Sequence, residues 1–272
     1  MNPLAPRRAL VAPLALAIAL ASVALHAQGG PQGGRFELNG DFLVEVDGKA
    51  SPKATLYFSA AAKAYLVIAP ELASPVSVSA GTGQVESLDL MKVARQDGFV
   101  DLLPGATLAP EGRWEFAGEE LVFRVGARAV RLKPRPWLLG SHTGSEVLAH
   151  DPGYGRKASL YKPIADVLSR VRAAKQEVRV LAFFGSWCPH CKDHLPSMLK
   201  VEQALAGSTV RFDYYGVPSP FNKEPEAKKW AVNGVPTAIV LVGGREVGRI
   251  SGNQWGSPEM AIYDLLKGAG AL

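Results

Sequence analysis

The stretch that decides the fold of the second half of the chain is residues 178–192, VRVLAFFGSWCPHCK. Its first part, Val178 to Phe184, is a run of β-branched and aromatic residues, which is typical of a strand buried in the centre of a sheet. Gly185-Ser186-Trp187 predicts a turn, and a helix is expected to follow through Leu205. The stretch therefore predicts a strand–turn–helix unit with two cysteines at the start of its helix.

These cysteines, Cys188 and Cys191, are the two that the chain holds, and both lie in one four-residue window. The loop between them is too short to join distant parts of the chain, unlike the structural disulfides of many exported proteins. The pair is therefore either a redox-active dithiol or part of a metal site. A local disulfide without further function is a third interpretation.

The residues around this unit predict alternating helices and strands. Apolar residues at helical spacing predict one amphipathic helix from Ala158 to about Lys175. Further predictions are strands at 210–215, 238–242 and 246–250, a short helix at 225–230 and a closing helix at 258–267. The order is helix, strand, helix, strand, helix, strand, strand, helix, which is an α/β arrangement.

Three motifs occur together in this half of the chain. They are Trp187-Cys188-Pro189-His190-Cys191-Lys192, Pro196 in the following helix, and Gly234-Val235-Pro236-Thr237 before a later strand. Pro236 lies 45 positions after Cys191, which leaves room for a helix, a strand and a helix of ordinary length. With these motifs, residues 157–272 resemble the thioredoxin-like superfamily, in particular exported thiol–disulfide oxidoreductases with a Cys-Pro-His-Cys active site. The resemblance covers well under half of the chain.

The chemistry of thiol–disulfide exchange explains the motif around the cysteines. The attacking species is a thiolate, and a helix start stabilises it through free backbone N–H groups and the positive end of the helix dipole. Cys188 is expected to attack and Cys191, one turn later, to resolve the mixed disulfide. Pro189 suits a first helical turn. A protonated His190 would favour the reduced state and make the disulfide a stronger oxidant.

The resemblance also implies roles for residues outside the helix. It implies a cis peptide bond between Val235 and Pro236, which would lie against the active-site sulfurs and present backbone groups to a peptide substrate. Trp187 is expected to cover the dithiol. No bound cofactor is needed, because the electrons reside in the sulfurs.

Two positions depart from the family pattern. Thioredoxins keep a buried Asp six residues before the first cysteine, where this chain has Ala182. Reductases of the family that mature cytochromes usually have a Glu where this chain has His194. The direction of electron flow stays open. His190 and the missing Asp favour an oxidase or isomerase, whereas Trp187 and the compact domain favour a reductase fed by a membrane partner.

A metal-binding function is the alternative from a different class. Cys188, Cys191 and His194 form C-x-x-C-x-x-H, which could hold Cu(I) or Zn(II) on one helical face. The sequence shows no second cysteine or methionine cluster to complete such a site. The hypothesis is therefore a copper-binding or delivery protein, to be weighed against redox chemistry.

Residues 35–140 predict a β-rich domain. Short strands recur with turn signals between them, and Gly118-Glu119 and Gly126-Ala127 predict hairpins, as in a small all-β barrel or sandwich. The domain contains no cysteine or histidine and shows no catalytic constellation. It could bind a partner or mediate dimerisation. Residues 141–156, rich in Gly, Ser, His and Asp, are expected to be a linker, with His142 and His150 exposed, so residues 157–272 should fold alone.

The first 27 residues predict a signal peptide. Arg7 and Arg8 precede an apolar run from Ala9 to Leu25, and small residues follow. Cleavage after Ala24 or Ala27 would place the protein in the periplasm or outside the cell, while an uncleaved membrane anchor and a twin-arginine signal are the alternatives. Residues 28–34, QGGPQGG, form a spacer. Without the signal the formal net charge falls from +5 to +3, and no basic cluster indicates a nucleic-acid partner. The expected partners are protein thiols and disulfides.

Overall fold

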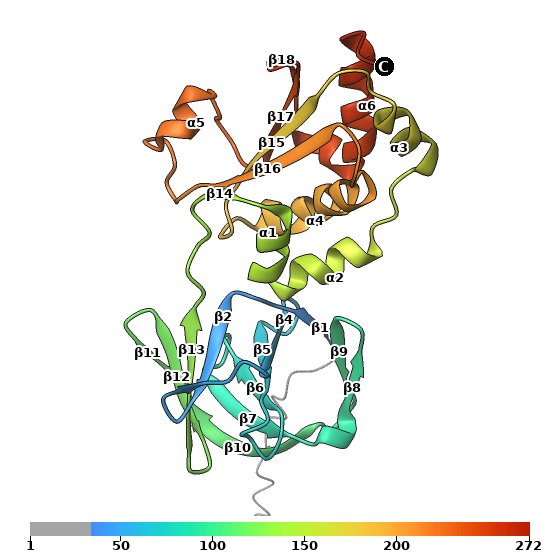
Figure 1. The fold of residues 1–272 in the computed structure, drawn as a ribbon. Helices are drawn as coiled ribbons and strands as arrows, with labels where there is room; N and C mark the ends of the chain where they lie inside the picture. Colours follow the sequence, from blue (N-terminus) through green and yellow to red (C-terminus); the bar gives the residue numbers. More distant parts are fainter. Residues whose placement is uncertain (1–33) are drawn as a thin grey trace, which may run out of the picture.

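The computed structural model describes residues 34–272, which form an all-β domain followed by an α/β domain (Figure 1). The predicted signal peptide, residues 1–27, and nearly all of the spacer lie outside the described residues. Within residues 34–272, none of the helices is long and apolar enough to cross a membrane.

The β domain consists of two antiparallel sheets that curl around shared apolar side chains (Figure 1). The described strands of one sheet run in the order β10-β7-β6-β5-β4-β1-β9-β8, and those of the other in the order β11-β12-β13-β2-β3. Val44 and Leu132 from the second sheet pack with Leu56 and Val78 from the first in one buried cluster. The bounds are β1 Arg35–Leu38, β2 Phe42–Val46, β3 Lys49–Ala50, β4 Thr55–Ser59, β5 Ala64–Ile68, β6 Val76–Ser79, β7 Gln84–Leu88, η1 Leu90–Lys92, β8 Val93–Gln96, β9 Phe99–Leu102, β10 Thr107–Arg113, β11 Glu115–Ala117, β12 Glu120–Val125 and β13 Arg128–Pro134.

The two predicted hairpins are present. Gly118-Glu119 joins β11 to β12, and Gly126-Ala127 joins β12 to β13. Gly118 and Gly126 have φ angles of 68° and 56°, which glycine adopts at little steric cost. The all-β fold expected for this half of the chain is therefore confirmed.

The α/β domain is built on a sheet with the strand order β14-β16-β15-β17-β18. The central strand, β15, pairs in parallel with β16 and antiparallel with β17. The bounds are β14 Gly140–His142, α1 Gly144–His150, α2 Pro152–Leu160, α3 Ala165–Arg172, β15 Val178–Phe184, α4 Pro189–Ala204, β16 Val210–Gly216, α5 Pro225–Lys229, β17 Thr237–Val242, β18 Arg245–Ile250, η2 Gly252–Gly256 and α6 Pro258–Gly268.

The side chains of β15 point alternately into two cores. Val180 and Phe184 belong to the larger core, which also receives the apolar faces of α2, α3, α4 and α6. Leu181 and Phe183 belong to a smaller core on the other face, which α5 covers through Ala227. Burial on both faces explains why this strand is a continuous apolar run rather than an alternating one.

The segment expected to be a linker is folded. Residues 141–156 contain most of β14, all of α1 and the first half of α2, and β14 pairs with β16. Val147 and Tyr154 are 0% and 1% exposed and belong to the core of the α/β domain. His142 and His150 are half-buried rather than exposed. The prediction of a linker is therefore wrong, because helix caps and a few apolar residues fold this polar segment onto the domain.

The helix expected from Ala158 to Lys175 is interrupted. α2 ends at Leu160 and α3 begins at Ala165. Pro163 lies in the break, and the residue before a proline is disfavoured in helical conformation. The Glu259 carboxylate of α6 accepts hydrogen bonds from the Tyr161 hydroxyl at 2.7 Å and the Ile164 N–H at 3.1 Å, and these bonds fix the break between the two helices.

The two domains meet where α2 and α4 approach the turn between β1 and β2. Lys192 of α4 forms an ion pair with Asp41 in that turn. On α2, Arg156 pairs with Asp97 of the β domain at 3.4 Å. Gly40 packs so closely against Asp151 that a side chain at position 40 would overlap its carboxylate. The β domain thus contacts the residue directly after Cys191.

Candidate active site

The strand–turn–helix unit places the two cysteines at the start of α4. Cys188 is the N-cap residue, in extended conformation, and Pro189 occupies the first helical position. The Cys188 N–H donates to the Gly185 carbonyl at 2.9 Å, which closes the turn after β15. Cys188 therefore lies at the positive end of the α4 helix dipole, which favours a negative charge on its sulfur.

The two thiols differ in their surroundings. Both are free, but Cys188 is 5% exposed, whereas Cys191 is fully buried. The Gly185 N–H lies 3.4 Å from the Cys191 Sγ. Burial raises the pKa of the Cys191 thiol well above its usual range. Cys188 is therefore the more accessible of the two thiols.

The Val235–Pro236 peptide bond is cis, as the resemblance implies. The Val235 carbonyl lies 3.8 Å from the Cys188 Sγ. The Pro236 carbonyl accepts a hydrogen bond from the Trp255 Nε1 at 3.2 Å, and Trp255 is 1% exposed. A buried tryptophan thus fixes the backbone next to the Cys188 sulfur.

Trp187 lies beside the dithiol and is half-buried. Its Nε1 donates to the Val217 carbonyl at 2.9 Å, and its ring packs against Gly185. It also lines a cavity of about 630 Å³, together with Pro220, Phe221 and Val232. The sequence does not predict this cavity, because its walls come from segments between the recognisable motifs.

The two histidines near the dithiol in sequence, His190 and His194, are more exposed than the cysteines. Pro189 and His190 are exposed, and His194 is half-buried. Among residues 34–272, no three side chains of His, Cys, Asp or Glu lie together as a metal site requires. His194 thus does not join the two cysteines in a set of ligands, and nothing in the structure supports the copper hypothesis.

Ala182, in the position of the family's buried acid, is 1% exposed and packs in the larger core. The sequence does not predict a role for Tyr154 of α2, which belongs to the same core as both cysteines. Its buried hydroxyl has no hydrogen-bond partner in the described residues. Burial and the nearby Asp151 and cysteines raise the pKa of Tyr154 well above its usual range. The signal for α2 was present in Asp151-Pro152, an N-cap followed by a first-turn proline.

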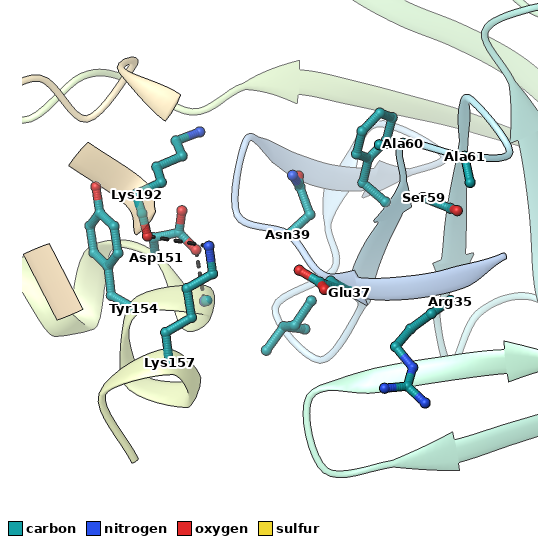
Figure 2. A pocket seen from close by; sticks show the side chains of 13 residues that line it. Arg35, Glu37, Asn39, Ser59, Ala60, Ala61, Asp151, Tyr154, Lys157 and Lys192 are labelled. Atoms are coloured by element: carbon teal, nitrogen blue, oxygen red, sulfur yellow. Dashed lines mark hydrogen bonds between the residues drawn. The ribbon is translucent and has the colours of Figure 1, made fainter. Parts of the chain in front are cut away.

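A second cavity, of about 410 Å³, lies between the domains and is lined in part by Asp151 and Tyr154. Figure 2 shows Asp151, Tyr154, Lys157 and Lys192 facing Asn39 and other residues of the β domain across it. Lys157 bonds the Lys192 carbonyl at 3.3 Å and the Asp193 carboxylate at 2.6 Å. The start of α4 therefore contacts α2 through Lys157 and the β domain through Asp41.

Comparison with known proteins agrees with this geometry. Residues 166–262 match the thioredoxin family model. The C-terminal domain is thioredoxin-like. Among curated proteins, the comparison found no match.

Three similar solved structures illustrate the range of the likeness. A protein of unknown function from Pseudomonas aeruginosa is 14% identical over 46% of this chain and 85% of its own, with a TM-score of 0.35. Mitochondrial thioredoxin 3 from Saccharomyces cerevisiae, in its oxidized form, is 22% identical over 40% of this chain and 98% of its own, with a TM-score of 0.28. Thioredoxin f from spinach chloroplast is 29% identical over 35% and 81%, with a TM-score of 0.28.

Proposed function

We propose that the protein is an exported thiol–disulfide oxidoreductase that exchanges electrons between its Cys188–Cys191 pair and the cysteines of protein substrates. One observation carries the proposal. The Cys188 sulfur lies at the start of α4, 3.8 Å from the carbonyl before cis-Pro236, with Cys191 buried behind it. A reactive thiol, a resolving thiol and a backbone for the substrate to pair with are thus together.

In the reducing direction, the Cys188 thiolate attacks one sulfur of a substrate disulfide. A bond forms between Cys188 and that sulfur, the substrate S–S bond breaks, and the second substrate sulfur leaves as a thiolate that takes up a proton. Cys191 then loses its proton and attacks the Cys188 sulfur. The Cys188–Cys191 bond forms, the bond between Cys188 and the first substrate sulfur breaks, and that sulfur leaves and takes up a proton in place of the one that Cys191 released. Two electrons have then passed to the substrate. Oxidation of a substrate dithiol follows the same steps in reverse.

Burial of Cys191 supports this order of steps. A thiol whose pKa is raised by burial stays protonated in the free enzyme, so it does not compete with Cys188 for the substrate. It becomes a nucleophile when Cys188 is held in a mixed disulfide beside it. The arrangement separates the attacking sulfur from the resolving one.

The test uses single cysteine variants of the full chain. Cys188→Ser is expected to abolish turnover of a protein disulfide, and Cys191→Ser to accumulate mixed disulfides with substrates. Alkylation of the reduced protein should label Cys188 before Cys191, as peptide mass mapping would show. Labelling of Cys191 first would reverse the assignment.

Two further measurements complete the proposal. The reduction potential of the pair, equilibrated against glutathione, decides whether the protein oxidises its substrates or reduces them with electrons from a membrane partner. Export is supported by the basic and apolar pattern of residues 7–27. Cleavage of the signal peptide predicts that the exported protein begins at Leu25 or Gln28, which N-terminal sequencing would show. An intact N-terminus on the exported protein would contradict cleavage.

A further inference from the structure

We infer that Trp137, from the segment between the domains, forms with Trp187 an apolar platform beside Cys188 that selects substrate cysteines with apolar side chains nearby in an extended chain. This inference rests on the proposed function. Trp137 lies outside residues 166–262, which match the family. Its role would therefore be a feature of this chain.

The two tryptophans are neighbours at the active site. The centroids of their rings are 6.3 Å apart, with the ring planes inclined at 53°. Trp187 directly precedes Cys188 in the chain. The platform thus begins at the residue next to the reactive sulfur and extends away from it.

The backbone beside Trp137 is fixed in place. The Leu138 N–H donates to the Ser186 Oγ at 3.0 Å, and Ser186 is 7% exposed. On the other side, the Leu138 carbonyl packs so closely against Gly216 that any side chain at position 216 would overlap it. The position of Trp137 is therefore tied to the turn that carries Cys188.

Two large apolar residues of this segment, Trp137 and Leu139, face solvent, although the backbone of Leu138 between them is fixed. Trp137 is 47% exposed and Leu139 is 53% exposed. Ordering a large apolar side chain at the surface gains little in the free protein, because most of its area stays in water. The same side chain gains its hydrophobic contribution when a substrate covers it, and tryptophan is among the residues that contribute most at such interfaces.

The occupant follows from the chemistry at Cys188. A substrate sulfur must come within bonding distance of the Cys188 sulfur, so the chain that flanks it must pass over the neighbouring residues. A strand advances about 3.3 Å per residue, so the spacing of the two rings corresponds to about two residues of extended chain. We expect the platform to contact side chains two to four residues from the substrate cysteine. The cavity beside Trp187, with Pro220 and Phe221 in its wall, adds apolar surface that this chain could cover.

The test compares two peptides of equal length and charge, each with one cysteine in a disulfide with a small thiol. One peptide carries Leu two and four residues from the cysteine on both sides, and the other carries Ser there. The full-length protein is expected to favour the Leu peptide by about tenfold in kcat/KM, the ratio that corresponds to roughly 1.4 kcal/mol. Trp137→Ala should remove most of that preference, because kcat/KM falls much more for the Leu peptide than for the Ser peptide.

The controls separate this inference from the proposed function and from loss of structure. Hydroxyethyl disulfide has no flanking residues, so Trp137→Ala should lose much less activity on it than on the Leu peptide, and turnover of this substrate shows that the site is folded. Trp137→Phe should keep part of the preference. Phe116→Ala, which removes an aromatic ring that is 65% exposed on β11 of the β domain, should keep all of it.

The outcomes are decisive in each arm. Equal rates for both peptides in the unaltered protein would overturn the inference, as would a preference that survives Trp137→Ala. An equal loss on both peptides and hydroxyethyl disulfide would give Trp137 a structural role only. Failure of the unaltered protein to turn over hydroxyethyl disulfide would instead count against the proposed function.

Discussion

Removing residues 136–156 from the α/β domain should destabilise it strongly, although the sequence predicts that residues 157–272 fold alone. The perturbation is a comparison of two fragments, residues 136–272 and residues 157–272. Both lack the β domain, so the loss of the contacts between domains is common to both. The difference between them reports what β14, α1 and the start of α2 contribute.

The magnitude follows from two buried side chains. Val147 and Tyr154 are 0% and 1% exposed, and both are absent from the shorter fragment. Burying a large apolar side chain stabilises a fold by about 1.5–3 kcal/mol, so the two together contribute about 3–6 kcal/mol. The unpartnered Tyr154 hydroxyl places the sum nearer the lower figure. Domains are stable by about 5–15 kcal/mol in total, so the loss is a large share.

Urea unfolding followed by tryptophan fluorescence measures the difference. We expect residues 136–272 to unfold cooperatively and residues 157–272 to unfold at lower urea or to lack a cooperative transition. Val147→Ala in the longer fragment should cost part of the same free energy. Equal free energies of unfolding for the two fragments would refute the reasoning and restore the boundary at residue 157.

Three further predictions concern His190, Tyr154 and His150. His190 is exposed, so solvent screens its charge, and an exposed ion pair contributes at most about 1 kcal/mol. His190→Ala should therefore make the pair more reducing by about 20 mV or less, since about 30 mV corresponds to 1.4 kcal/mol. Tyr154→Phe removes a buried hydroxyl without a partner and should stabilise the protein by about 1 kcal/mol in urea unfolding. His150 has a pKa lowered to about 4 by burial and by the positive charges of Arg135, His142 and Lys192. The unfolded chain therefore binds a proton that the folded one excludes, and stability should fall as the pH drops from about 6.5 towards 4.

Each of these has a result that would contradict it. A shift of 60 mV in His190→Ala would mean that the imidazole contacts the Cys188 sulfur. A loss of stability in Tyr154→Phe would show that the hydroxyl has a partner. For His150, the His150→Gln variant is the control, and urea unfolding at pH 7 and pH 5 is the assay. The same loss of stability in the variant would assign the pH dependence to other groups.

The sequence predicted the active-site unit well because its signals are local. A buried apolar run, a glycine turn, a cysteine cap and Pro189 lie within fifteen consecutive residues. The cis bond before Pro236 came from the resemblance, and the structure confirms it. The strand, the turn and the helix start depend on neighbours in the chain, so they can be predicted without knowledge of the tertiary fold.

The folding of residues 141–156 and the Trp137–Trp187 contact could not be predicted, because they depend on contacts that composition does not indicate. Residues 141–156 fold because the capping box of Thr143 and Glu146 starts α1 and Asp151 starts α2, while Val147 and Tyr154 supply the apolar contacts. Helices this short have too few turns for a periodic apolar pattern. The approach of Trp137 to Trp187 joins segments fifty residues apart, and no local signal in either segment predicts it.

The ion pair between Lys192 and Asp41 limits how far the two halves can change separately. Lys192 lies one helical turn after Cys188 and directly after Cys191, while its counter-charge belongs to the other domain. A thioredoxin-like half moved onto a different partner domain would keep its motif but leave Lys192 without the Asp41 carboxylate. Substitutions in the turn between β1 and β2 would therefore alter the surroundings of the helix that carries Cys188 and Cys191, and the two halves should be inherited, and engineered, as one unit.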